Sequence, residues 1–140
     1  MLINKVAVIT GAKSGIGLAM AERFALEGAR IILSDIRMAN TETERIKNNG
    51  REVFFFQVDV SKAQDVESLF EEAINKYGRI DILVNNAGIE LAKNIPETSI
   101  EEWDHLMSIN LKGVFYVQRL QCRSGVIINM ASELGLVGGI

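Results

Sequence analysis

The sequence predicts a doubly wound α/β fold, in which helices cover both faces of a parallel sheet. Apolar strand-like runs alternate along the chain with segments whose apolar residues recur at helical intervals. The strand-like runs are continuously apolar and do not alternate with period two, as is typical of parallel strands buried on both faces. No linker, low-complexity tract or internal repeat divides the sequence, so residues 1–140 are expected to form a single domain.

The first half of the chain contains two strand–helix units and a third strand. Residues 5–9 (KVAVI) are the first expected strand, and residues 15–27 are the helix after it, with Ile16, Met20, Phe24 and Ala25 on one face and Gly28 as its end. The remaining elements of this half are a strand at 30–34, a short polar helix at 41–49 that Gly50 ends, and a strand at 53–58.

The second half continues the alternation. Ser61 and Gln64 have the spacing of a capping box, and apolar residues from Val66 to Ile74 and Tyr77 recur at helical intervals up to Gly78. Residues 80–84 are the fourth expected strand. Ser99 and Glu102 form a second capping-box pattern, for a helix that contains Trp103, Leu106, Met107, Val114 and Val117, and residues 126–130 are the fifth strand.

The composition excludes several classes of function. The chain is 48% hydrophobic and 24% charged, with a formal net charge of −3 and no basic cluster to follow a nucleic-acid backbone. One Cys and one His provide neither an internal disulfide nor a His/Cys zinc site. Carboxylates alone could still hold a hard cation, but no metal site is expected. No apolar segment approaches the roughly 20 residues of a membrane span, and no signal peptide is recognisable. We expect a cytoplasmic protein without nucleic-acid or membrane partners.

The segment Thr10–Gly17 (TGAKSGIG) joins the first strand to the first helix. In a doubly wound sheet this turn lies at the ligand-binding crevice, where glycines allow a pyrophosphate to approach the backbone and the helix N-terminus favours its charge. Gly11, Gly15 and Gly17 have the spacing G-x-x-x-G-x-G, which differs from G-x-G-x-x-G and from the P-loop. Such a turn alone could be a tight connection, but Asp35 ends the next strand, where an acid can bind ribose hydroxyls.

Five motifs in this order resemble those of the short-chain dehydrogenase/reductase family, whose fold is Rossmann-like. They are Thr10-Gly11-x-x-x-Gly15-x-Gly17, Asp59-Val60, Asn85-Asn86-Ala87-Gly88, Asn110 and Asn129-x-x-Ser132. The resemblance covers essentially the whole chain. It implies an oxidoreductase that moves a hydride between a nicotinamide dinucleotide and a secondary alcohol or carbonyl substrate, such as a sugar or hydroxyacyl compound, and that forms a homodimer or homotetramer.

The resemblance also assigns a role to individual residues. Those expected at the cofactor are Gly11, Lys13, Ser14, Gly15, Ile16, Gly17, Asp35, Asp59, Val60, Asn86, Ala87 and Gly88. Asp59 would lie near the adenine amino group; the alternative is a polar strand end with Ser61 capping the next helix. Ser132 would donate a hydrogen bond to the substrate oxygen. Asn110 would hold a water of a proton relay, or be a satisfied core amide.

Other residues that could suggest chemistry have simpler interpretations. A serine after a buried strand can be a hydrolase nucleophile, but G-x-S-x-G is absent and His105 lies in a predicted helix, so it is expected at the surface. Trp103 and the run Phe54–Phe56 are expected to be packing residues.

The choice between the two nicotinamide dinucleotides depends on residues near the adenosine ribose. The carboxylate of Asp35 would repel a 2′-phosphate, which favours NAD(H), and Ser14 stands where relatives that prefer the phosphate often carry a basic residue. Arg37 and Lys13 are the counter-arguments, because a nearby cation can accept that phosphate.

The family's catalytic tyrosine, with a lysine one turn later, should follow Ser132 by about a dozen residues, but the sequence stops at Ile140. Tyr77 and Tyr116 do not replace it, because the residues four positions on are Asp81 and Leu120. We therefore expect either part of a complete dehydrogenase or a nucleotide-binding module without turnover. The short distance from Asn110 to the fifth strand further predicts that residues are omitted between Val117 and Arg123.

Overall fold

The computed structural model describes residues 1–120 and 125–132. Five parallel strands form one sheet in the order β3-β2-β1-β4-β5. The strands are β1 (Val6–Thr10), β2 (Arg30–Asp35), β3 (Val53–Gln57), β4 (Ile82–Asn85) and β5 (Val126–Asn129). The strand order changes direction between β3 and β4, which makes the carboxyl ends of β1 and β4 the switch point where such sheets bind ligands.

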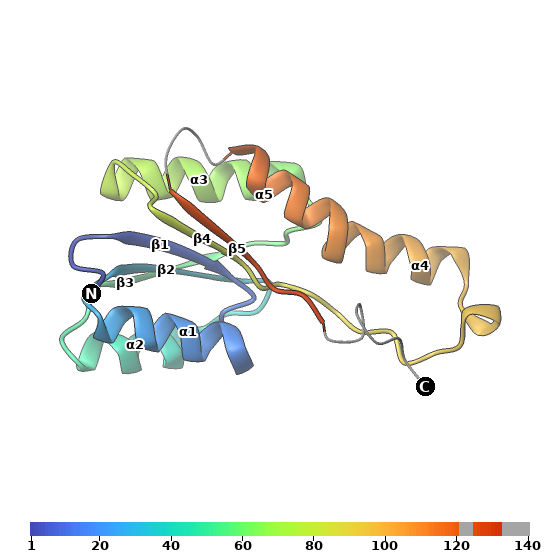
Figure 1. Ribbon diagram of the computed structural model, residues 1–140, viewed down its shortest axis with the longest axis horizontal. Helices are drawn as coiled ribbons and strands as arrows, with labels where there is room; N and C mark the ends of the chain where they lie inside the picture. The colour runs from blue at the N-terminus through green and yellow to red at the C-terminus, as the bar shows by residue number, and fades with distance from the viewer. Residues whose placement is uncertain (121–124, 133–140) are drawn as a thin grey trace.

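Helices cover both faces of this sheet (Figure 1). They are α1 (Gly15–Leu26), α2 (Asn40–Asn48), α3 (Ala63–Tyr77), α4 (Ile100–Met107), the π-helical turn η2 (Ser108–Gly113) and α5 (Val114–Leu120), with a 3₁₀ turn η1 (Ile95–Glu97). Helices α1 and α2 lie on one face, and α3 and α5 lie on the other. The predicted doubly wound α/β architecture is confirmed.

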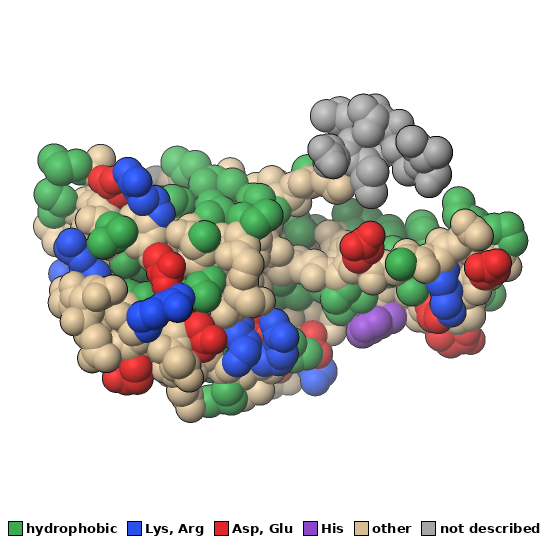
Figure 2. Space-filling view, turned by 90° about the horizontal axis from the view of Figure 1, so that it is seen from below, with side chains coloured by type: hydrophobic (Ala, Val, Ile, Leu, Met, Phe, Trp, Pro, Cys, Tyr) green, Lys and Arg blue, Asp and Glu red, His purple; other side chains and the backbone are tan. Residues whose placement is uncertain are grey.

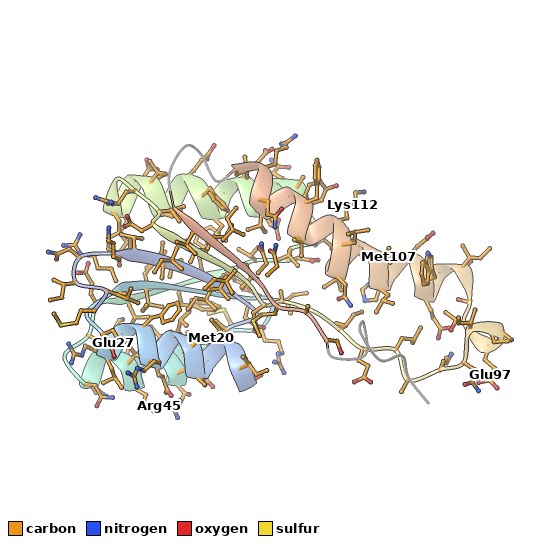
Figure 3. The ribbon with its side chains drawn as sticks, in the orientation of Figure 1. Met20, Glu27, Arg45, Glu97, Met107 and Lys112 are labelled. Carbon is orange, nitrogen blue, oxygen red and sulfur yellow. The ribbon has the colours of Figure 1, made fainter. Side chains whose placement is uncertain are left out.

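The core consists of two apolar layers, one on each side of the sheet. Alternate residues of the central strand β1 enter opposite layers: Ala7 and Ile9 pack with α1 and α2, whereas Val6 and Val8 pack with α3 and α5. Met20 extends from α1 into the first layer (Figure 3). Since all of β1 is buried, the turn that follows it starts from a rigid base.

The segment after β4 forms an arm that extends beyond the sheet (Figures 1 and 3). It contains η1 at its tip, α4 and the start of η2, and Glu97, Met107 and Lys112 mark its course in Figure 3. The predicted capping box starts α4: Ser99 Oγ accepts from the Glu102 N–H (3.2 Å), and the Glu102 carboxylate accepts from the Ser99 N–H (3.0 Å).

Two helix starts differ from the predicted ones. The buried face of α1 is formed by Gly17, Ala21 and Ala25, and Ile16 is exposed, because close approach of the backbone at Gly17 turns that position inward. The capping box predicted at Ser61 does not form. Ser61 Oγ donates to the Asp59 carboxylate instead (2.6 Å), and α3 has no side-chain cap at its first turn.

Ile74, predicted on the buried face of α3, is half-exposed.

The exposure of the aromatic residues and of the histidine can be compared with the predictions. Phe54 and Phe56 pack against the sheet layer as expected, and His105 lies on the surface of the arm, where it is the purple side chain in Figure 2. Trp103 was expected in packing but is 52% exposed. The reason is that α4 extends past the sheet, which leaves the tryptophan without an apolar layer to pack against.

The face formed by α1 and α2 carries charges of both signs, interspersed in Figure 2. Ion pairs such as Arg45 with Glu22 and Arg23 with Glu27 bring these charges together. None of the helices within residues 1–120 and 125–132 is long and apolar enough to cross a membrane.

Strand β5 is the edge of the sheet within the described part of the chain. It pairs with β4, and its apolar residues Val126 and Ile127 are exposed. The predicted omission between Val117 and Arg123 falls partly on residues 121–124, which lie outside the described residues; α5 is described up to Leu120.

Candidate nucleotide-binding and catalytic site

The turn after β1 requires glycine at two positions. A Cβ at Gly11, where φ is +63°, would lie 2.8 Å from the Ala87 Cα. A Cβ at Gly17 would lie 2.4 Å from the side-chain nitrogen Nδ2 of Asn86 and 2.5 Å from the Gly11 carbonyl oxygen. All three distances are shorter than the contacts that real Cβ atoms make, so the turn and the segment after β4 can approach this closely only with glycines.

Hydrogen bonds fix this approach. The Thr10 hydroxyl accepts from the N–H groups of Asn86 and Ala87 (3.1 Å each) and donates to the Val84 carbonyl (3.3 Å). The Asn86 side chain donates to the carbonyls of Thr10 and Gly11 (3.0 Å each). The carboxyl ends of β1 and β4 are therefore joined by side chains as well as by strand pairing.

A pocket of about 310 Å³ opens beside this junction. It is lined by eight of the twelve predicted cofactor residues: Gly11, Ser14, Asp35, Asp59, Val60, Asn86, Ala87 and Gly88. Arg37, which the sequence indicated near the adenosine ribose, also lines it. The other lining residues were not indicated by the sequence: Ser34, Ile36, Val58, Ile89 and Ile109. Ser34, Ile36 and Val58 flank predicted acids at strand ends, which is the one sequence signal that could have indicated them.

The remaining predicted cofactor residues are not part of the pocket lining. Gly15 and Gly17 belong to the turn and the first turn of α1, and Ile16 is exposed beside them. The Lys13 ammonium donates to the Met38 carbonyl, and the Lys13 N–H donates to the Asp35 carboxylate.

Asp35 forms one wall of the pocket at the end of β2 and is 7% exposed. Its carboxylate accepts from the N–H groups of Lys13 (3.1 Å) and Arg37 (3.0 Å). The Arg37 guanidinium lies 3.6 Å from the same carboxylate and donates to Ser14 Oγ (3.3 Å). Since a carboxylate offers about four acceptor positions, Asp35 retains capacity for ligand hydroxyls.

Asp59 lies after β3 on the wall of the same pocket. Burial alone would raise the pKa of Asp59, but hydrogen bonds from the Ser61 hydroxyl and N–H and the charge of Lys62 outweigh it and lower this pKa below its usual value. Asp59 is therefore an anion at neutral pH. Ser61 orients this carboxylate and does not cap α3, so the alternative interpretation of Ser61 as a cap is wrong.

Asn110 lies in the π-helical turn η2, a geometry that is frequent at functional sites. Its amide clamps Ile89 after β4: Nδ2 donates to the Ile89 carbonyl (2.8 Å) and Oδ1 accepts from the Ile89 N–H (2.9 Å). Asn110 is exposed, so the interpretation as a core amide is wrong, although both ends of the amide have partners.

Ser132 follows the end of β5 and lies outside the pocket lining, as does Asn110. The strand end before it is held by Asn129, whose side-chain oxygen accepts from the amides of Asn85 and Gln118 (2.8 Å each). The Met130 N–H donates to the Asn85 carbonyl (2.9 Å). No group of His, Cys, Asp and Glu within the described ranges could hold a metal ion.

A crevice at the switch point, glycines that allow close approach and an acid at each of two strand ends are typical of nucleotide-binding α/β proteins. A family model described as short chain dehydrogenase matches residues 5–140. The chain belongs to the short-chain dehydrogenase/reductase family.

Named relatives agree with this assignment. An uncharacterized oxidoreductase of Thermotoga maritima is 42% identical over 96% of this chain and 56% of its own length. The 3-oxoacyl-(acyl-carrier-protein) reductase of Staphylococcus aureus is 37% identical over 99% of this chain and 60% of its own length. An uncharacterized oxidoreductase of Mycobacterium tuberculosis is 36% identical over 99% of the chain and 59% of its own length. The chain thus spans less than two thirds of the length of these relatives.

Proposed function

We propose that the chain is the nucleotide-binding part of an oxidoreductase that transfers a hydride between NAD(H) and a secondary alcohol or carbonyl compound. The observation that carries the proposal is the pocket in which the glycine turn, Asp35 and Asp59 converge. Membership of an oxidoreductase family supports the reaction class.

The residues of the pocket fit a dinucleotide. The pyrophosphate would lie on the turn from Gly11 to Gly17 at the N-terminus of α1, where backbone N–H groups and the helix dipole favour negative charge. The Asp35 carboxylate would accept from the adenosine ribose hydroxyls, and the ionised Asp59 would accept from the adenine amino group.

The Asp35 environment supports NAD(H) over NADP(H). A 2′-phosphate would face a carboxylate that is largely shielded from water, where repulsion between like charges is strong. The Arg37 guanidinium is held beside the Asp35 carboxylate and Ser14. Part of the positive charge of Arg37 is therefore neutralised by Asp35 within the protein.

Ser132 and Asn110 would serve the chemical step. A bound nicotinamide supplies or accepts the hydride. The Ser132 hydroxyl would donate to the substrate oxygen and stabilise the negative charge that develops there. Asn110 orders the backbone at Ile89, and a water held near it would pass a proton.

The group that exchanges the proton with the substrate oxygen is proposed to lie outside the described residues. Tyr77 does not qualify, because burial beside Glu52 raises its pKa to about 12 and it lies at the end of α3. Tyr116 packs within α5 against the α3 side of the core.

The alternative function is a nucleotide-binding module without turnover. Such a module would bind the nucleotide in the same pocket, but Ser132 would take part in no reaction. Because the Staphylococcus aureus relative is a 3-oxoacyl-(acyl-carrier-protein) reductase, a 3-oxoacyl thioester is the first substrate to test. A homodimer or homotetramer in the cytoplasm remains part of the proposal.

The experiment uses the complete polypeptide. Fluorescence titration with NADH tests the pocket, and NADH consumption is then followed with a 3-oxoacyl thioester, simple ketones and ketoses. Turnover of any of these supports the dehydrogenase. NADH binding without turnover across the panel favours the module, and no binding of NADH or NADPH rejects both functions.

A further inference from the structure

One side chain connects the element that carries Asn110 to the element that carries Ser132. Gln118 lies in α5, which continues directly from the π-helical turn that contains Asn110. Its Nε2 donates to the side-chain oxygen of Asn129 (2.8 Å), the last residue of β5. Ser132 follows three residues later.

The same oxygen of Asn129 accepts from Asn85 Nδ2 (2.8 Å), so it is held from two directions. Asn85 approaches from the neighbouring strand β4, and Gln118 approaches from the helix layer. Beyond this point the Met130 N–H donates to the Asn85 carbonyl, which continues the strand pairing by one residue toward Ser132.

The position of β5 makes this contact important. Within the described ranges β5 pairs with β4, and this pairing acts in the plane of the sheet. The Gln118 side chain reaches the end of β5 from α5. It therefore restrains movement of the strand end relative to the helix, which pairing with β4 does not restrain.

We propose that Gln118 is a positioning residue, which acts through Asn129 to fix Ser132 relative to the helix that carries Asn110. The functional part of this inference rests on the proposed dehydrogenase function. Catalytic groups must be held to within a fraction of an ångström, and a misplacement of about 1 Å can cost up to a hundredfold in rate.

The contact joins three uncharged carboxamides, Gln118, Asn129 and Asn85. Loss of Gln118 should therefore lower kcat without moving the pH profile of kcat, whereas loss of a proton-transfer group would change that profile. Since the nucleotide pocket does not include Gln118, the affinity for NADH should be unaffected.

The test compares Gln118→Met with Gln64→Met in the complete polypeptide. Methionine keeps the length of glutamine and removes its hydrogen bonds, and Gln64 is an exposed glutamine in the first turn of α3. We expect Gln118→Met to lower kcat about tenfold, with the NADH dissociation constant unchanged within about twofold. Hydrogen exchange of the amides at 126–132 should become faster, and those of β1 should not change.

Each outcome decides a separate point. Unchanged exchange at 126–132 in Gln118→Met, or an unchanged kcat in an active enzyme, would overturn the proposal. If the wild-type protein turns over no substrate, the dehydrogenase function fails, and the exchange measurement alone decides whether Gln118 holds the strand end. Equal effects from Gln64→Met would indicate general destabilisation and would also overturn it.

Discussion

Asp35 combines two roles at the pocket, since it fixes the backbone of the glycine turn through the Lys13 N–H and presents a negative charge to the ligand. Asp35→Asn removes the charge and keeps an acceptor oxygen for one of the two backbone bonds, which come from the N–H groups of Lys13 and Arg37. We expect the ratio of NADPH to NADH dissociation constants to fall by roughly tenfold, which corresponds to about 1.4 kcal/mol. Fluorescence titration measures it, with the exposed Glu44→Gln on α2 as the control.

Wild-type protein that bound NADPH more tightly than NADH would contradict the NAD(H) preference. The Arg37 guanidinium would then be the group that accepts the phosphate, having moved from its contact with Ser14.

Ser132 is expected to act in the chemical step and not in cofactor binding. Ser132→Ala in the complete enzyme should lower kcat by roughly two or more orders of magnitude, the scale for losing one donor to a developing oxyanion. Binding of NADH should be nearly intact, because the pocket lining does not include Ser132. A Ser132→Ala enzyme with normal kcat would remove this residue from the mechanism.

Among single residues, the sequence predicted those pocket residues that lie at the ends of strands. Asp35 ends β2, Asn86 directly follows β4 and Asp59 lies two residues after β3, and parallel strands bring such positions to one edge. Ile89 and Ile109 could not be predicted, because they reach the pocket through the clamp that Asn110 makes on the arm, which is a tertiary contact.

Asp81 joins the starts of β1 and β4 by hydrogen bonds, and we expect it to stabilise the folded protein. Its carboxylate accepts from the Val6 N–H (2.9 Å), while the Val6 carbonyl accepts from the Asp81 N–H (2.9 Å). Asp81→Ala leaves the N–H of a fully buried residue without this partner, which should cost about 1–3 kcal/mol. Urea denaturation measures it, with the exposed Asp104→Ala as the control.

The same carboxylate makes stability depend on pH. Burial alone would raise the pKa of Asp81, but hydrogen bonds from Arg79 and the Val6 N–H, with the charges of Arg79 and Lys5, lower it below the usual value. A lowered pKa in the folded state stabilises the protein above the ordinary carboxyl range, and this stability is lost as the pH falls through the folded pKa. Asp81→Asn should therefore lose less stability than wild type on acidification, and an equal loss would contradict the assignment.

The helix predictions succeeded where no competing partner was present. Ser99 and Glu102 form their capping box at the start of an exposed helix, whereas Ser61 bonds to Asp59, a nearer and charged acceptor. The π-helical turn at Asn110 was not predictable, because the apolar residues around it keep ordinary helical spacing. Trp103 was misplaced since its pattern does not reveal that α4 extends past the sheet.

Among the residues that the structure describes, β5 forms an apolar edge of the sheet, where Val126 is 57% exposed. Unprotected edges pair with other strands. Residues 1–140 produced alone should therefore form concentration-dependent oligomers in sedimentation experiments, and Val126→Lys should reduce them because a charge on an edge strand opposes pairing. A wild-type fragment that stayed monomeric at high concentration would contradict this expectation.

The internal omission predicted near Val117 concerns the whole chain as well. The alignment with the Staphylococcus aureus relative extends over 147 positions, more than the 140 residues of the chain, so it contains gaps in this chain. These gaps show that the relative has residues without a counterpart in this chain, and the omission itself stays a prediction. The intact mass of the natural protein, compared with 15.5 kDa, tests whether further residues exist.

The side-chain junction between Thr10 and Asn86 has a consequence for the order in which the molecule is made. The two residues are 76 positions apart, and the chain is synthesised from its N-terminus at about 5–20 residues per second. Strands β1, β2 and β3 can pair as soon as they leave the ribosome, but the glycine turn acquires its closing contacts only after Asn86 has emerged. A nascent chain should therefore hold a sheet before it holds a nucleotide, and NADH should not accelerate the earliest folding events.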